Sequence, residues 1–207
     1  IFIPTNEKII HILSTESGKL EKSIEIELDF FSEIIVDSKL IYFGSKQDTV
    51  TAIDRENNSV LWQRVMSSEV MSLSKILNNM IFVKTNDSKI TAIDIKTGKF
   101  MWVNSQIPAP LSVRGSSSPI IYNDMVLVGF EDGKIISYNH LNGDINWQIQ
   151  IPSIKTDTII DRLNDIDGKM LIDDGTLFAI SYQGSLIAVD TFSGQVLWSR
   201  DASSLYG

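Results

Sequence analysis

The chain has 207 residues, of which 43% are hydrophobic and 21% charged, so it is long enough to bury a substantial core. No apolar run reaches the length of a membrane-spanning helix. A net charge of −8 argues against nucleic acid as a partner, and the absence of cysteine excludes disulfides, thiolate metal sites and a cysteine nucleophile.

One short phrase recurs along the chain, and its copies align on tryptophan. A degenerate copy comes first, with Ser14, Gly18 and Lys22 in the places of Asp, Gly and Trp. The four clear copies end in Trp62, Trp102, Trp147 and Trp198, and carry Asp54, Asp94, Asn139 and Asp190 eight residues earlier. The successive spacings of 40, 40, 45 and 51 residues are typical of solenoids, propellers and arrays.

Each period contains four short apolar runs, which predict four strands. In one period they are Ser118–Tyr122, Met125–Phe130, Lys134–Tyr138 and Asp144–Ile149, separated by turn sequences such as Asn142-Gly143. The run around Lys134 alternates polar and apolar residues, whereas Met125–Val128 is continuously apolar, as expected of a strand buried between two sheets. A four-stranded antiparallel sheet repeated with this period predicts an all-β fold, a β-propeller.

The repeats place about five blades in one domain over residues 1–207. Their approximate bounds are 1–28, 29–67, 68–107, 108–152 and 153–207. Ile1–Pro4 is expected to form the second strand of a blade, so an innermost strand is expected upstream, and the chain stops where a new blade should start.

The repeated residues have structural explanations. An indole at one fixed register is expected to pack between blades, because it buries a large area. Gly98, Gly143 and Gly194, or Asn58 in their place, stand four residues before each Trp and suit a turn with positive φ. The Asp or Asn at eight before each Trp is expected to accept hydrogen bonds from turn amides.

Two links between blades are longer than the 40-residue period requires. Those after Trp102 and Trp147 carry five and eleven extra residues, and they belong to adjacent blades. Because strands alternate in direction, both links should emerge side by side on one face of the propeller. They combine apolar residues, arginine and aspartates, a mixture suited to protein docking, although loops that only cover the ends of the blades are an equal alternative at this point.

No catalytic constellation or cofactor motif is present. His11 and His140 fall at different phases of the repeat, and no phosphate-binding, dinucleotide-binding or hydrolase motif occurs. The densest polar group consists of Asp157, Asp161, Asn164, Asp165, Asp167, Asp173 and Asp174. It supplies only part of a calcium loop, so a solvated acidic loop is the simpler interpretation and neither a metal nor a cofactor is expected.

Three segments are similar to a known family. The segments Leu111–Pro119, Asp161–Asp167 and Leu177–Trp198 resemble the BamB family, the lipoprotein subunits of the bacterial outer-membrane β-barrel assembly machine. The Trp phrases alone would indicate only the broader PQQ-like repeat superfamily. The resemblance implies an eight-bladed propeller, without enzymatic activity, of which about three blades lie outside this sequence.

The resemblance also implies partners and a site. Members of the family bind the periplasmic POTRA domains of BamA, reach other Bam subunits through BamA, and assist insertion of unfolded outer-membrane proteins. The matching contact residues would be Leu111, Val113, Arg114, Asp165 and Asp167, with Val113 in place of the family's leucine. The implied location is the periplasmic face of the outer membrane, through a lipidated N-terminal cysteine that this sequence lacks.

Two other functions share the repeat. A quinoprotein dehydrogenase fragment would require vicinal cysteines over its cofactor, and the chain has no cysteine. A ligand-sensing propeller would show polar and aromatic groups converging on a central funnel.

Overall fold

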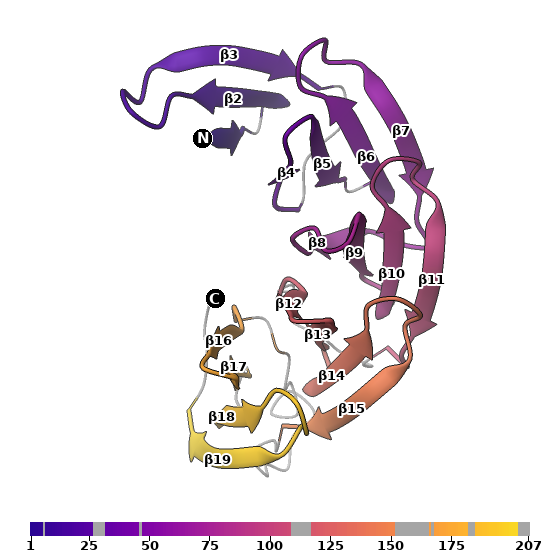
Figure 1. The fold of residues 1–207 in the computed structure, drawn as a ribbon, viewed down its shortest axis with the longest axis vertical. Coiled ribbons are helices and arrows are strands. Elements are labelled where there is room, and N and C mark those ends of the chain that lie inside the picture. The colour runs from indigo at the N-terminus through magenta and orange to yellow at the C-terminus, as the bar shows by residue number, and fades with distance from the viewer. Residues whose placement is uncertain are drawn as a thin grey trace.

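The computed structural model describes residues 1–5, 7–26, 32–45, 47–108, 117–151, 166, 168–181 and 185–202. These residues form five antiparallel sheets that follow one another around an arc, with the outermost strand of each sheet on the convex side (Figure 1). The β-propeller architecture predicted from the repeat is therefore confirmed. In the described part of the chain, no helix has the length and hydropathy needed to cross a membrane.

Each sheet is one blade, and its strands are paired in chain order. Blade 1 contains three described strands, β1 (Phe2–Pro4), β2 (Ile9–Leu13) and β3 (Leu20–Glu25). Blade 2 contains β4 (Ile35–Val36), β5 (Leu40–Gly44), β6 (Thr49–Asp54) and β7 (Val60–Val65). Blade 3 contains β8 (Val70–Leu73), β9 (Met80–Thr85), β10 (Lys89–Asp94) and β11 (Phe100–Ser105).

The last two blades repeat this plan. Blade 4 contains β12 (Ile120–Tyr122), β13 (Met125–Gly129), β14 (Lys134–Asn139) and β15 (Ile145–Gln150). Blade 5 contains β16 (Leu171–Asp173), β17 (Thr176–Ile180), β18 (Ser185–Asp190) and β19 (Val196–Asp201). The second and third strands of blades 2 to 4 are the most buried, because a neighbouring blade covers each of their faces.

The recurring phrase forms the turn between the third and fourth strands of each blade. Asn58, Gly98, Gly143 and Gly194 all have φ between 62° and 75°, a region that glycine and asparagine adopt most readily. The preceding Asp or Asn accepts turn amides, as when Asp94 Oδ1 accepts the N–H groups of Lys96 and Thr97 at 3.1 and 2.8 Å. The repeated phrase therefore encodes the same turn between the third and fourth strands of blades 2 to 5.

The tryptophans of three blades pack on the glycine of the next blade. The indole N–H of Trp62 donates to the carbonyl of Ile95 at 2.9 Å, and Trp102 and Trp147 make the same bond to His140 and Thr191. A Cβ atom added at Gly98 would lie 2.7 Å from the Trp62 ring, closer than real Cβ contacts allow. The glycine is thus required by the indole as well as by the turn.

At the first junction, between blades 1 and 2, the degenerate copy uses a different pair. Lys22 stands in the Trp place, and its ammonium donates to the carbonyls of Arg55 and Glu56 at 2.8 and 3.0 Å. Arg55 follows Asp54 just as Ile95 follows Asp94, so Lys22 reaches the same point of the turn that an indole reaches elsewhere. Asn58, which carries a Cβ atom, stands where the other junctions require glycine.

The turn aspartates make the free energy of unfolding depend on pH in the acid range. Hydrogen bonds from the amides of Asn57 and Glu56 hold the pKa of Asp54 below its usual 3.8, and those from the hydroxyl and amide of Ser193 lower the pKa of Asp190. A carboxyl group whose pKa is lower in the folded state contributes stability above the unfolded pKa, and that contribution is lost as the pH falls through the folded pKa.

We therefore expect the Asp54→Asn, Asp190→Asn double variant to be less stable than the wild type at neutral pH and to approach it as the pH falls below about 4. Asn139 shows that asparagine can hold this turn, because its Oδ1 accepts the Leu141 amide at 2.9 Å. Thermal unfolding followed by circular dichroism across this range measures the difference. A constant difference in unfolding midpoint would contradict the expectation.

Candidate protein-docking face

One side of the arc carries both long links between blades. Because the strands alternate in direction, the links 106–119 and 151–170 emerge on the same side as the turns 86–88 and 130–133. Hydrogen bonds fix this arrangement at the start of each link, where the amide of Gln106 donates to Ser88 O and that of Ile151 donates to Gly133 O, both at 2.9 Å. We call this side the loop face.

The five contact residues expected from the sequence lie outside the described residues. Leu111, Val113 and Arg114 belong to the segment 109–116, and Asp165 and Asp167 flank the described residue Ile166. The structure does describe residues next to these segments, among them Gln106, Ser117, Ile151 and Ile166.

Ile166 anchors the second link to the blades. Its side chain is 1% exposed and belongs to the core cluster between blades 4 and 5. Its amide donates to the carbonyl of Phe130, and its own carbonyl accepts the amide of Ser117, both at 3.3 Å. Gly129 makes room for it, because a Cβ atom there would lie 2.7 Å from Ile166 Cγ2 and 2.8 Å from Ser117 Oγ.

The two links therefore meet at one point. Ser117 directly follows the segment 109–116, and Ile166 stands between the two aspartates of the second link. Ser72 of blade 3 also donates to the carbonyl of Ser117 at 3.3 Å, so three blades contribute to this junction. The spacing of the repeats predicts that the links are neighbours, but it does not predict the anchoring contacts of Ile166 and Ser117.

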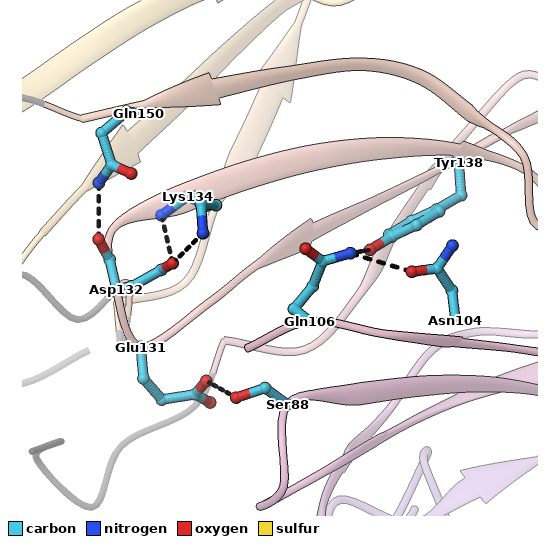
Figure 2. Close-up of polar contacts among 8 residues, drawn as sticks. All are labelled: Ser88, Asn104, Gln106, Glu131, Asp132, Lys134, Tyr138 and Gln150. Atoms are coloured by element: carbon cyan, nitrogen blue, oxygen red, sulfur yellow. Dashed lines mark hydrogen bonds and ion pairs between the residues drawn. The ribbon is translucent and has the colours of Figure 1, made fainter. Parts of the chain in front are cut away.

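A buried ion pair supports the loop face between blades 3 and 4. Lys84 Nζ lies 2.8 Å from Glu131 Oε1, and the two side chains are 1% and 8% exposed. The ammonium also donates to the carbonyl of Gly129 at 2.7 Å, and the hydroxyl of Ser88 donates to Glu131 Oε2 at 3.0 Å (Figure 2). The pair joins the turn 130–133 to the neighbouring blade.

Sequence reasoning missed this pair, although a signal was present. Lys84 directly follows the apolar run from Met80 to Val83, and both lie in the buried strand β9. A lysine within a buried strand needs a partner, because an unpaired charge is costly to bury. The partner could not be identified, since Glu131 lies 47 positions further along the chain in a turn that reads as solvated.

More exposed charges surround the buried pair. Asp132 pairs with Lys134 within its own turn, and Gln150 donates to the carbonyl of Asp132 at 2.6 Å (Figure 2). The turn of blade 3 repeats this pattern, with Asp87 paired to Lys89. Burial by itself raises the pKa of Asp87, but hydrogen bonds from Lys89, Thr85 and Ser67 outweigh it, and the pKa lies below its usual value. The Asp87 carboxylate is therefore ionised at neutral pH.

Gln106 holds the start of the first link in place through its side-chain hydrogen bonds. Its amide group donates to Asn104 Oδ1 at 2.9 Å and to the hydroxyl oxygen of Tyr138 at 3.3 Å (Figure 2). The Tyr138 side chain is buried, and burial raises its pKa well above the ordinary value, so the phenol stays neutral. The first link thus leaves the blades from a fixed position.

A hollow of about 820 Å³ lies along the innermost strands, on the concave side of the arc. Charged residues from several blades line it, among them Glu33, Lys75, Lys169 and Asp173, together with apolar residues of β12 and β16. Tyr122 is the one aromatic residue in the described lining, so these residues supply the polar groups expected of a ligand-sensing funnel but little of its aromatic surface.

The two histidines have separate structural contacts. His11 Nδ1 lies 2.9 Å from Ser23 Oγ in blade 1, whereas His140 is buried in blade 4, between Asn78 and the carbonyl of Asp124. Within the described ranges, no group of three or more His, Cys, Asp or Glu side chains could hold a metal ion.

Comparison with known proteins identifies relatives over the whole chain. A family model described as outer membrane protein assembly factor BamB matches residues 6–207. The chain is 33% identical to the outer membrane protein assembly factor BamB of Yersinia pestis over 166 residues, which cover 80% of the chain and 42% of that protein. It is 27% identical to the protein of the same name from Nitrosomonas eutropha, over 100% of the chain and 53% of that protein.

Solved structures agree with the fold. BamB from Moraxella catarrhalis superposes with a TM-score of 0.87 at 23% identity, covering 99% of the chain and 62% of that structure. A quinohemoprotein alcohol dehydrogenase from Comamonas testosteroni superposes with a TM-score of 0.68 at 13% identity, covering 85% of the chain and 35% of that structure. The chain spans about half the length of the curated relatives that it matches.

Proposed function

The chain belongs to the BamB family of outer membrane protein assembly factors, and we propose that it acts as a non-catalytic scaffold that binds the periplasmic POTRA domains of BamA. In this role it would contribute to the insertion of outer-membrane proteins at the periplasmic face of the outer membrane. The loop face would be the contact surface, with the segments 109–116 and 152–167 reaching the partner.

The convergence of the two links carries this proposal. Ser117 and Ile166 are hydrogen-bonded to each other and fixed to three blades, so the segments that begin and end there share one base. A fixed base favours binding, because less conformational freedom is lost when the partner docks. A docking role accounts for two lengthened links side by side better than the covering of blade ends, which the shorter links already achieve.

Each expected contact residue has a role in this proposal. Leu111 and Val113 would insert into an apolar groove of a POTRA domain, and Arg114 would pair with a carboxylate across the interface. Arginine and apolar anchors supply most of the energy in such interfaces. Asp165 and Asp167, on either side of Ile166, would either meet basic groups of the partner or brace Arg114 from the adjacent link.

The test is a calorimetric titration of the folded chain with purified POTRA domains. We expect Arg114→Glu to weaken binding by about thirtyfold or more, since a reversed charge loses its partner and repels the carboxylate. The matched control is Lys99→Glu, the same charge reversal at an exposed residue of a turn on the opposite face. Equal affinities for the wild type and Arg114→Glu would reject the proposed contact.

A second variant tests the anchor. Ile166→Ala is expected to weaken POTRA binding as well as to destabilise the fold, because the two aspartates would lose their common support. Ile24→Ala removes an equally buried isoleucine from the core between blades 1 and 2, so it should destabilise the fold without changing affinity. If both variants bind like the wild type under conditions where they are folded, Ile166 has no part in docking.

A further inference from the structure

The outermost strand of each blade lies at the edge of its sheet, on the convex side of the arc (Figure 1). Within the described residues, such a strand pairs with a neighbour on one side only, so its outward backbone N–H and C=O groups face solvent. Proteins commonly protect such edges with charged side chains or proline, because an unprotected edge accepts another strand. The residues of each outer strand therefore decide whether an extended peptide can bind there.

Strand β11 of blade 3 is the least protected of these edges. It contains no charged residue and no proline, whereas β3, β7 and β19 each contain at least one charge. Strand β15 is also uncharged, but most of its exposed side chains are amides. In β11, Phe100, Met101 and Val103 are 41%, 50% and 52% exposed. Blade 3 packs against a described blade on each side, so this exposure does not depend on the ends of the chain.

The hydrogen bonding of β11 shows which of its backbone groups face outward. The amide of Gln106, directly after the strand, donates to Ser88 O at 2.9 Å, so it points toward the β10 side. In an antiparallel pair, successive residues direct their N–H and C=O groups alternately toward and away from the partner strand. The groups of Val103 and Ser105 therefore point away from β10. They are the donors and acceptors that a further strand would use.

The side chains beside these groups are apolar. In the register of β10 and β11, Phe100 is opposite Ile93, and Val103 is opposite Thr91. Ile93 belongs to the core between blades 2 and 3, so Phe100 and Val103 lie on the sheet face that is directed toward blade 2. A strand paired with β11 would place every second side chain on that face, next to Phe100 and Val103. The edge therefore favours a peptide with apolar residues at alternate positions.

We propose that the outer edge of β11 binds an extended segment of an unfolded outer-membrane protein as an additional strand. Strands of outer-membrane barrels alternate apolar and polar residues over about 10 positions, which is the pattern that this edge favours. The choice of this source rests on the proposed function, whereas the binding edge rests on the structure of β11. Because β11 ends at the loop face, the bound segment would lie next to the proposed POTRA contact.

Fluorescence anisotropy with a labelled peptide tests the binding edge. The probe is a peptide of about 10 residues that alternates valine and threonine, with a lysine at each end for solubility. The control peptide has the same composition, but its valines form one block and cannot all lie on one face of a strand. We expect the chain to bind the alternating peptide about tenfold more tightly than the block peptide, or better.

A displacement experiment tests the source. An outer-membrane protein diluted from urea should displace the alternating peptide, because its unfolded chain contains many segments with this pattern. An unfolded helical protein at the same concentration is the control and should displace much less. Equal displacement by the two proteins would overturn the named source.

Two variants of Val103 locate the binding site. Val103→Lys should weaken binding of the alternating peptide by about tenfold or more, because a charge protects an edge against strand addition. Val103→Pro should weaken it too, because it removes an outward N–H without breaking a hydrogen bond to β10. The matched control is Gln148→Lys, which adds the same charge to β15 one residue after Trp147, as Val103 follows Trp102. It should bind like the wild type, and circular dichroism checks that each variant is folded.

Three results would overturn the proposal. A folded wild type that binds both peptides equally does not recognise the alternating pattern. Unchanged affinity in both Val103 variants places the peptide elsewhere. Self-association in sedimentation velocity that Val103→Lys abolishes gives the edge to a second copy of the chain.

The POTRA titration separates this inference from the proposed function. Val103→Lys should bind POTRA domains like the wild type, because its substitution lies on the convex edge. A wild type that binds the peptide but not POTRA domains rejects the scaffold function and leaves the β11 edge as a peptide site. Binding of POTRA domains without binding of the peptide rejects the β11 edge alone.

Discussion

Replacing Gly143 with alanine is expected to lower the free energy of unfolding by about 2–5 kcal/mol. Two effects add at this position. The backbone has φ of 75°, where a Cβ atom causes strain, and the new Cβ atom would lie 2.6 Å from the ring of Trp102. The indole cannot yield easily, because it is held by its hydrogen bond to His140 O and by contacts with Phe82 and Tyr138.

Gly18→Ala is the matched control for this prediction. Gly18 has nearly the same φ, 66°, but nothing lies within 4 Å of an added Cβ atom. It should therefore cost only the backbone strain, about 1–2 kcal/mol. Urea unfolding at low protein concentration measures both values. Equal losses at the two sites would mean that the turn alone requires glycine and that the indole does not.

Glu131→Ala is expected to lower the free energy of unfolding by about 3–5 kcal/mol. The substitution would leave the ammonium of Lys84 buried without its carboxylate, and the hydroxyl of Ser88 would lose its acceptor. Lys84 is 1% exposed, so the charge cannot reach water without moving strand β9 or the turn 130–133. Urea unfolding with circular dichroism detection gives the loss directly.

The neighbouring carboxylate provides the control. Asp132→Ala removes the partner of Lys134, but both of these side chains are a quarter or more exposed, so the cost should stay within about 1 kcal/mol. Replacing Lys84 and Glu131 together with methionine should recover most of the loss, because no buried charge then remains. A Glu131→Ala variant as stable as Asp132→Ala would show that the buried pair contributes little.

The repeat made most of the fold predictable. The fold can be predicted from the period, the four apolar runs and the turn residues, which are all short-range patterns. This works because each blade uses the same hydrogen-bonded turn and the same strand order. The positions of Asp94, Gly98 and Trp102 in one phrase already indicated a turn acceptor, a positive φ and an indole between blades. Even the neighbouring positions of the two long links followed from counting residues against the 40-residue period.

Other features depended on contacts between distant residues. The alternating run at Lys134–Asn139 resembles a half-exposed strand, yet Ile135–Tyr138 are all buried, because blades cover both faces of the sheet. Ser137 is buried in it and is accommodated by a hydrogen bond from Asn146 at 3.2 Å. Similarly, the sequence shows Lys22 only as a departure from the tryptophan of the repeat. The structure shows that its ammonium joins blades 1 and 2 by donating to the carbonyls of Arg55 and Glu56.

The features of the candidate site also fall into two groups, those that the sequence predicts and those that only the tertiary structure shows. The sequence by itself determined the blade, the turn and the family to which the chain belongs, since these rest on short-range patterns that repeat or match over many residues. The tertiary structure alone decided that Ile166 fixes the two links to one base and that Lys84 pairs with Glu131. These facts depend on which surfaces the packed blades bring together, and packing is a property of whole faces that no single segment encodes.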